Sequence, residues 1–363
     1  MSVLRIPADY DDAFSHMLGF GLASILEDAA EDRICRLWWS GRHTLMVETN
    51  DEITEMECAH IVRAHAERWH KSQWLNARGS YNGKEKTVAT LSPHIGKVIG
   101  REGWRTLEDD RRRAIDALQT ALDERYIGAL GEPSYWSLKR TKSFLNIGPE
   151  DIMQDDGASL WEMTYRVGGR EFVTDRLRKL ANILSKRSYE EVHSGLFGQT
   201  VVDELHDEKK GKDDSGASLT PTGLRVRSYT DNAQAWCALF GFSLFPLYKS
   251  VHHEASPTAG FVRQQNSERK FWQVVLPLVE TPWTLAKYRS VIRSWALVCA
   301  VDCIDIWHDN SSWDDNLLLQ EDTDIHAWLR QQGLRYCMLF TRFEVKPQNT
   351  TEYWLLRGQL VRL

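Results

Sequence analysis

Residues 12–29 read DAFSHMLGFGLASILEDA, and this stretch predicts the buried centre of the fold. Its large apolar side chains recur at helical spacing, which predicts a single helix: Phe14, Met17, Leu18, Leu22, Ile25 and Leu26. Gly19 and Gly21 interrupt this pattern. Each glycine costs about 1 kcal/mol relative to alanine inside a helix. Their presence predicts that another backbone packs closely against this helix.

Two strands and a second helix are expected next. Arg33–Trp39 and Thr44–Glu48 have the composition of strands, and Ser40–Gly41 between them predicts the turn of a hairpin. Residues 51–75 have a helical pattern that Asn50 or Asp51 could cap. The chain is therefore expected to open in the order helix, strand, strand, helix.

The middle of the sequence predicts a long loop between two helices. Residues 76–104 are rich in Gly, Ser, Asn and Lys, and loops of this length are often functional. Leu107–Leu130 predicts a third helix, which Gly131 and Pro133 would end. Residues 159–173 predict a hairpin that turns at Gly168–Gly169.

The rest of the chain alternates helices with strands. Helices are predicted at 174–185, 231–245 and 284–299, and strands at 271–279, 334–345 and 353–362. The last two strands form a C-terminal β-hairpin. The polar stretch 206–223, HDEKKGKDDSGASLTPTG, is either a flexible surface loop or a linker. These elements predict an α+β fold of mixed helices and short antiparallel sheets, with an N-terminal α+β domain (1–205) and a C-terminal α+β region (224–363) that are separate or packed as one unit.

Composition places the chain among globular proteins. It has 363 residues, of which 42% are hydrophobic, and its 15 Trp, 11 Tyr and 12 Phe exclude disorder of the whole. No run of about 18 apolar residues occurs, so no membrane-spanning helix is expected. The first residues, MSVLRIPADYDD, lack the pattern of a signal peptide. The six scattered cysteines indicate reduced core thiols, which fits a cytoplasmic location.

No common catalytic motif is present in the sequence. It contains no Walker loop, no GxGxxG after a strand, no GxSxG and no HExxH, and we expect neither a catalytic residue nor a cofactor. The segment Cys299–Asp309, CAVDCIDIWHD, is the best alternative. A metal-dependent hydrolase or nuclease would be centred on Cys303–Asp309, with His308 as a ligand. Thiols beside carboxylates are a mixed set of soft and hard ligands, and otherwise these thiols are buried and the carboxylates solvated.

A basic, aromatic stretch occupies the middle of an otherwise acidic chain. The net charge is −6, whereas residues 61–187 hold 23 basic and 17 acidic side chains, a net +6. Cations neutralise phosphates and aromatic rings stack on bases, so this stretch predicts a nucleic-acid-binding surface. Its candidate residues are Lys71, Trp74, Arg78, Lys84, Lys86, Lys97, Arg101, Trp104, Arg105, Lys139, Arg140 and Lys142. The alternative is that the tryptophans belong to the core and the cations to a solvated rim.

Three stretches together carry a family resemblance: HMLGFGLASILEDA (16–29), SLWEMTYRVGGREFVTDRL (159–177) and DNAQAWCALFGFSLFPL (231–247). In the order and character of these segments, the chain resembles a family encoded with type I CRISPR–Cas systems of the subtype I-U/I-G kind. Members of this family are small proteins of the large-subunit type. The resemblance spans much of residues 12–245. A C-terminal β-hairpin departs from the helical bundle that ends many members of that family.

The resemblance implies a non-catalytic subunit of an RNA-guided Cascade complex. Such subunits lie near the 5′ end of the crRNA, recognise the protospacer-adjacent motif on double-stranded target DNA, help to open the duplex, and dock the helicase-nuclease beside other Cascade subunits. In RNA-guided systems the protein reads the short duplex motif and guide pairing reads the sequence. A third hypothesis is an interaction scaffold without a nucleic-acid role, in which exposed tryptophans anchor protein interfaces.

Overall fold

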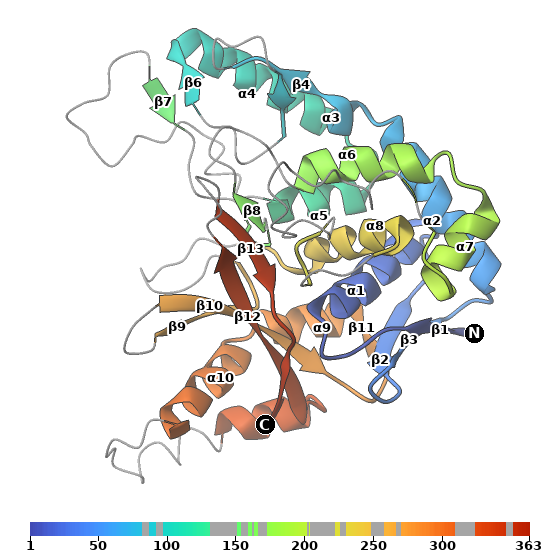
Figure 1. Ribbon diagram of the computed structural model, residues 1–363, viewed down its shortest axis with the longest axis vertical. Coiled ribbons are helices and arrows are strands. Elements are labelled where there is room, and N and C mark those ends of the chain that lie inside the picture. The colour runs from blue at the N-terminus through green and yellow to red at the C-terminus, as the bar shows by residue number, and fades with distance from the viewer. Residues whose placement is uncertain are drawn as a thin grey trace.

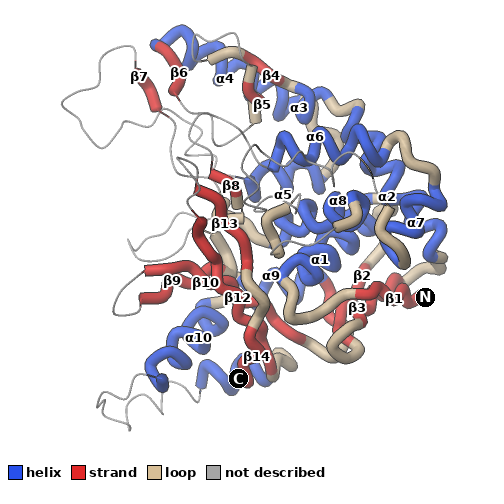
Figure 2. Tube along the Cα trace, in the orientation of Figure 1, coloured by secondary structure: helices blue, strands red, loops and turns tan. Residues whose placement is uncertain are grey.

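The computed structural model describes residues 1–81, 87–91, 97–130, 151–153, 159–161, 163–165, 173–201, 203, 222–225, 230–247, 258–265, 270–308, 324–345 and 351–363. Helices and antiparallel sheets share the fold, which confirms the predicted α+β class. Figure 1 shows α1 and α8 at the centre of the molecule, with a small sheet near the N-terminus and a larger sheet on the other side. Figure 2 shows several helices around this pair and others at the two ends of the molecule.

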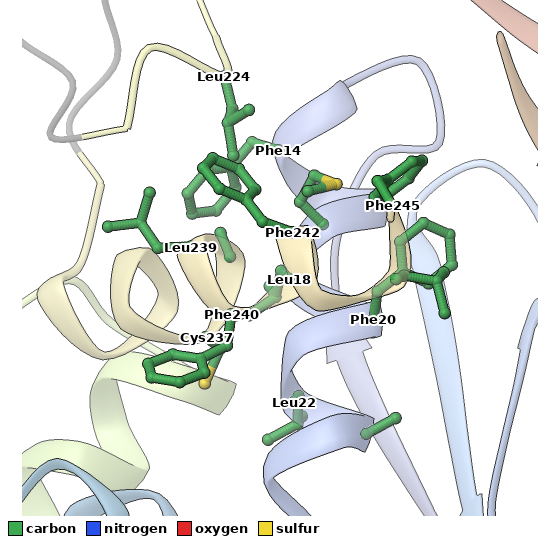
Figure 3. Packing of buried hydrophobic residues seen from close by; sticks show 14 of the residues in the cluster. Phe14, Leu18, Phe20, Leu22, Leu224, Cys237, Leu239, Phe240, Phe242 and Phe245 are labelled. Carbon is green, nitrogen blue, oxygen red and sulfur yellow. The ribbon is translucent and has the colours of Figure 1, made fainter. Parts of the chain in front are cut away.

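Helix α1 (Ala13–Asp28) is the centre that the sequence predicts. All its residues from Ala13 to Leu26 are buried, and α8 (Asn232–Phe240) packs across it (Figure 3). A Cβ atom on Gly21 would overlap the backbone of Cys237, and one on Gly241 would overlap the backbone of Met17. The predicted close approach of a second backbone is therefore confirmed at Gly21, whereas Gly19 faces the Leu45 side chain. After α8 the chain continues as a buried 3₁₀ turn, η2 (Gly241–Leu244).

The predicted first hairpin is confirmed as part of a four-stranded antiparallel sheet. Strands β2 (Cys35–Trp39) and β3 (Thr44–Thr49) pair with each other, and β11 (Trp283–Thr284) joins β2. Strand β1 (Ser2–Pro7), which the sequence analysis did not predict, pairs with β3. Leu4 and Ile6 of β1 are buried. The chain therefore begins with a strand, and the predicted opening order was incomplete.

The predicted start of the second helix at Asn50 or Asp51 is wrong. Helix α2 (Glu55–His70) begins after Thr54, whose hydroxyl accepts from the Glu57 N–H while the Glu57 carboxylate accepts from the Thr54 N–H. This reciprocal capping box satisfies N–H groups at the helix start. The Asp51 carboxylate instead forms an ion pair with the Arg33 guanidinium, 2.8 Å away. A short helix, α3 (Gln73–Asn76), follows α2 after its own cap at Ser72.

The predicted loop 76–104 and helix 107–130 both need correction. The first contains the short pair β4 (Arg78–Gly79) and β5 (Val88–Ala89), then β6 (Lys97–Ile99), and its end belongs to α4 (Gly100–Asp116). The second is interrupted, because α5 (Ala121–Leu130) starts separately. The Asp123 carboxylate accepts from the N–H of Thr120 at 2.9 Å, and the Thr120 hydroxyl accepts from the N–H of Asp123. This local cap starts a new helix where the apolar pattern suggested continuity.

Helix α6 (Val173–Leu184) confirms the predicted helix 174–185, and α7 (Tyr189–Phe197) follows it without having been predicted. Strand β8 (Thr164–Tyr165) lies where a local hairpin was expected, but it pairs with β13 (Thr351–Leu355) of the C-terminal region. The turn predicted at 168–169 and residues 206–221 of the predicted loop lie outside the described residues. Strand β7 (Asp151–Met153) pairs with β6.

The larger sheet is antiparallel and has the order β8-β13-β12-β10-β9, with β14 (Gln359–Arg362) also paired to β12 (Tyr336–Val345). Strand β10 (Lys270–Leu278) confirms the predicted strand 271–279, and β9 (Phe261–Gln265) extends the sheet. The C-terminal hairpin is confirmed, although its second arm is divided into β13 and β14.

The helix predicted at 284–299 is divided into α9 (Leu285–Ile292) and α10 (Trp295–His308). The Ser294 hydroxyl accepts from the N–H of Leu297 at 3.3 Å and so caps the second helix. One hydrophobic core contains residues from both sides of the 206–223 stretch, including Phe14 and Trp69 on one side and Trp236 and Phe340 on the other.

Candidate functional site

A cavity of about 440 Å³ lies at the N-terminal end of α1. Four parts of the chain line it: residues 7–18, the β2–β3 turn at His43, the segment of Arg225 and Gln234 beside α8, and residues 355–357 between β13 and β14. Pro7, Ala8, Leu18 and Leu355 supply apolar walls, whereas most of the remaining lining is polar. The fold therefore builds a mixed polar and apolar pocket from segments far apart in the sequence.

The rim of the cavity is a charge network on loop residues. The Arg357 guanidinium lies 3.2 Å from Asp9 and 2.6 Å from Asp11, and the Gly358 N–H donates to the Asp11 carbonyl at 2.8 Å. His43 Nδ1 lies 2.6 Å from the Asp9 carboxylate. Partial burial disfavours ionised Asp9, but hydrogen bonds from His43 and Arg357 outweigh this and lower the Asp9 pKa. The network ties the segment before α1 to the two turns beside it.

The inner part of the cavity is built around Asp12 and Arg225. The Asp12 carboxylate caps α1 by accepting from the Phe14 N–H at 3.1 Å, and it faces the Arg225 guanidinium at 2.7 Å. That guanidinium also stacks on the Phe14 ring, 3.9 Å from its centroid. Burial raises the pKa of Asp12, while the Arg225 charge opposes the rise. Burial likewise lowers the pKa of Arg225, and Asp12 opposes that change.

Each ionised side chain of this cavity faces a group of opposite charge, so the arrangement is suited to holding a ligand by hydrogen bonds and apolar contact. This site was not predicted from the sequence. Asp9, Asp12, His43, Arg225 and Arg357 form no motif, because the fold brings them together across more than 300 positions of sequence. The adjacent acids Asp11 and Asp12, at the start of the predicted first helix, were the one local signal.

The predicted basic, aromatic surface is partly described. Lys71 is exposed and lies 2.6 Å from Glu67, and Arg78 is exposed in β4. Trp74 is 3% exposed and packs edge-to-face on Trp69, with ring centroids 4.4 Å apart. Its ring therefore belongs to the core, and the proposed stacking role of Trp74 is not supported by its position.

Helix α4 carries the continuation of that surface. Arg105 is exposed, and the backbone of Lys97, Arg101 and Trp104 lies in β6 and α4. Lys84, Lys86, Lys139, Arg140 and Lys142 lie outside the described residues. Helix α4 packs on the β4–β5 segment through a hydrogen bond of 2.8 Å from the Tyr81 hydroxyl to Asp110. The candidate set is thus brought together in part, through α3, β4 and α4 at the upper end of Figure 1.

The alternative site at Cys303–Asp309 lies in the last part of α10 and just beyond it. The helix includes Cys303 and His308, but their side chains and Asp309 lie outside what the structure describes. In the described part of the chain, no group of three His, Cys, Asp or Glu side chains is placed to hold a metal ion. Burial raises the pKa of the Cys58 and Cys337 thiols to about 12.

No protein-family model matches this chain, and no curated protein matches its sequence. Across the described residues, none of the helices combines the length and the apolar content needed to cross a bilayer.

Proposed function

We propose that this protein is a non-catalytic, nucleic-acid-contacting subunit of an RNA-guided type I CRISPR effector complex in the cytoplasm. Its partners would be crRNA, double-stranded target DNA, other Cascade subunits and the helicase-nuclease. In this proposal it recognises the protospacer-adjacent motif and helps to open the duplex, while guide pairing reads the sequence. The assignment to this kind of complex rests on the resemblance of residues 12–245.

The single observation that supports nucleic-acid contact is the exposure of two arginines that have no carboxylate partner among the described residues. Arg78 in β4 and Arg105 in α4 are exposed, and within the described residues neither guanidinium is paired with a carboxylate. Lys84, Lys86, Lys97 and Arg101 lie between them in the sequence. Unpaired surface cations bind phosphates with release of counterions, so such a group supplies salt-dependent affinity for DNA.

The test is DNA binding by the assembled complex at several salt concentrations. Changing both Arg78→Ala and Arg105→Ala should weaken binding to all target sequences and reduce the salt slope by about 2, one for each lost phosphate contact. The matched control changes Arg112→Ala and Arg113→Ala, which are also exposed on α4 but already face Asp109 and Asp110. An unchanged salt slope in the first variant, with the complex intact, would contradict the proposed surface.

Trp295 favours a contact with a protein partner as well. It begins α10 and its side chain is 69% exposed, whereas Trp69, Trp161, Trp236 and Trp283 are buried. Exposed tryptophans often anchor protein interfaces. Trp295→Ala should weaken association with the neighbouring Cascade subunit while leaving the fold intact, as measured by size-exclusion chromatography of the complex and by circular dichroism. Unaltered association would remove Trp295 from the interface.

A further inference from the structure

The cavity at the start of α1 contains polar groups that the chain itself leaves unused. Ser15 is 2% exposed and lines the cavity, and its hydroxyl makes no hydrogen bond with any described residue. Buried hydroxyls in folded proteins almost always have a partner. The neighbouring Ser24 on the same helix shows the usual arrangement, because its hydroxyl donates to the Phe20 carbonyl at 2.8 Å. The Ser15 hydroxyl is instead open to the cavity, where water or a bound ligand can be its partner.

Gln234 adds a second unused group to the same wall. Its Nε2 donates to the Leu196 carbonyl at 3.3 Å, which holds the amide in place, while its Oε1 has no partner among the described residues. The Asp12 carboxylate, although paired with Arg225, has acceptor capacity left beyond these contacts. The inner wall thus presents acceptors at Gln234 and Asp12 and a hydroxyl at Ser15.

The charges of the cavity exclude a strong preference for an ion. Asp9 and Asp12 are matched by Arg357 and Arg225 among the lining residues. An anion or a cation would bring an additional charge to a site whose own charges are already matched, so no lining charge is left to compensate it. An uncharged ligand keeps every pair intact.

The apolar walls complete the description of the ligand. Leu18 and Leu355 are buried side chains that line the cavity, and they offer contact to a flat apolar face. A volume of about 440 Å³ lies within the range of small-molecule sites. From these features we propose that the cavity binds a nucleoside, an uncharged molecule with an apolar ring whose N–H edge faces Gln234 and Asp12. This site does not depend on the proposed DNA surface, because the two share no residue.

Isothermal titration of the full chain with adenosine, cytidine, guanosine and uridine tests the proposal. At least one nucleoside should bind with one-to-one stoichiometry at concentrations up to about 1 mM. Ser15→Ala, which keeps the space but removes the hydroxyl, should weaken that binding about three- to tenfold. Ser15→Val, which places a methyl group where the hydroxyl was and adds another, should weaken it further.

Gln234→Leu keeps the test decisive if Ser15→Val does not fold, because this position is only partly buried. The Gln234→Leu variant should also bind the nucleoside more weakly than the unchanged protein. Arg105→Ala is the matched control, and it should bind the nucleoside like the unchanged protein even where DNA binding is weakened. The proposal would be overturned if none of the four nucleosides bound, or if the Ser15 and Gln234 variants bound the nucleoside as tightly as the unchanged protein. Tenfold tighter binding of the corresponding mononucleotides would also overturn it.

Discussion

Gly21 lies directly against the carbonyl group of Cys237. A second contact of the same kind lies beside it, where Gly241 faces the backbone of Met17. The two glycines let the backbone of α1 approach that of α8 and its 3₁₀ extension, and Figure 3 shows the apolar side chains that pack around this crossing. Since close-packed interiors have little room for rearrangement, this crossing fixes the distance between the two helices.

Gly21→Ala should therefore destabilise the protein strongly. The added Cβ cannot be accommodated without moving a backbone, and overpacking of this kind costs about 1–3 kcal/mol or more. The measurement is the free energy of unfolding in urea. Gly128→Ala in α5 is the control, because a Cβ there meets nothing within 4 Å and should stabilise the helix by about 1 kcal/mol. Equal effects of the two substitutions would contradict the packing argument.

His16 should make stability depend on pH. It is buried against Trp39, its Nε2 donates to the Tyr10 carbonyl at 2.7 Å, and burial lowers its pKa to about 4. The unfolded chain, with a histidine pKa near 6.5, binds the proton more tightly, so stability is lost as the pH falls from about 6.5 towards 4.

Between pH 7 and 5 this single group should remove about 2 kcal/mol of unfolding free energy. His16→Gln retains a donor for Tyr10 but not the titration, and other ionisable groups contribute equally to both proteins. The unchanged protein should thus lose more stability than the variant over this interval. Parallel pH profiles would show that His16 is not the group responsible.

Arg187→Met should cost about 3–5 kcal/mol, because it leaves a buried carboxylate without its counter-charge. The Arg187 guanidinium lies 2.8 Å from Asp231 and 2.5 Å from Asp203, and the side chains of Arg187 and Asp231 are 5% and 1% exposed. Arg112→Met, which removes an exposed arginine of α4, should change stability by at most about 0.5 kcal/mol. Urea unfolding of both variants measures the difference, and equally small effects of the two substitutions would contradict a buried ion pair at Arg187.

Cys58 and Cys337 should resist alkylation in the native protein. With a pKa of about 12, each thiol has a thiolate fraction near one in ten thousand at pH 8, and both side chains are buried. Mass spectrometry after treatment with iodoacetamide at pH 8 should find them unmodified, whereas the same treatment in urea should label them. Rapid labelling in the native state would indicate local opening of α2 or β12.

The parts of the fold that sequence alone predicts are those with a strong local signal. The glycines of α1 predicted close backbone packing, which is found at Gly21, and the strand composition on both sides of Ser40–Gly41 predicted the β2–β3 hairpin. Helix boundaries were harder to predict from the sequence, because they depend on which side chain forms the cap. Thr54 and Glu57 cap α2, whereas Asp51, one of the two caps predicted from the sequence, is paired with Arg33.

Long-range features could not be predicted in this way. The position of Trp74 between cations suggested a surface, yet Trp69 and the surrounding aromatic rings give it a place in the core. Strand β8 has a partner almost 190 residues away, and the cavity beside Asp12 combines four separate segments. Such contacts are properties of the packed chain, and no local pattern encodes them.

The cavity walls come from both ends of this chain, which has a consequence for synthesis. A nascent chain that has emerged as far as α8 already holds Ser15, Arg225 and Gln234, but the wall of Leu355 and Arg357 is still to be translated. Because domains generally fold as units, the cavity is complete only after residues 355–357 have been translated and packed. Ligand binding at this site would thus require that the last hairpin has been translated. Premature termination before residue 355 would leave the pocket open on one side.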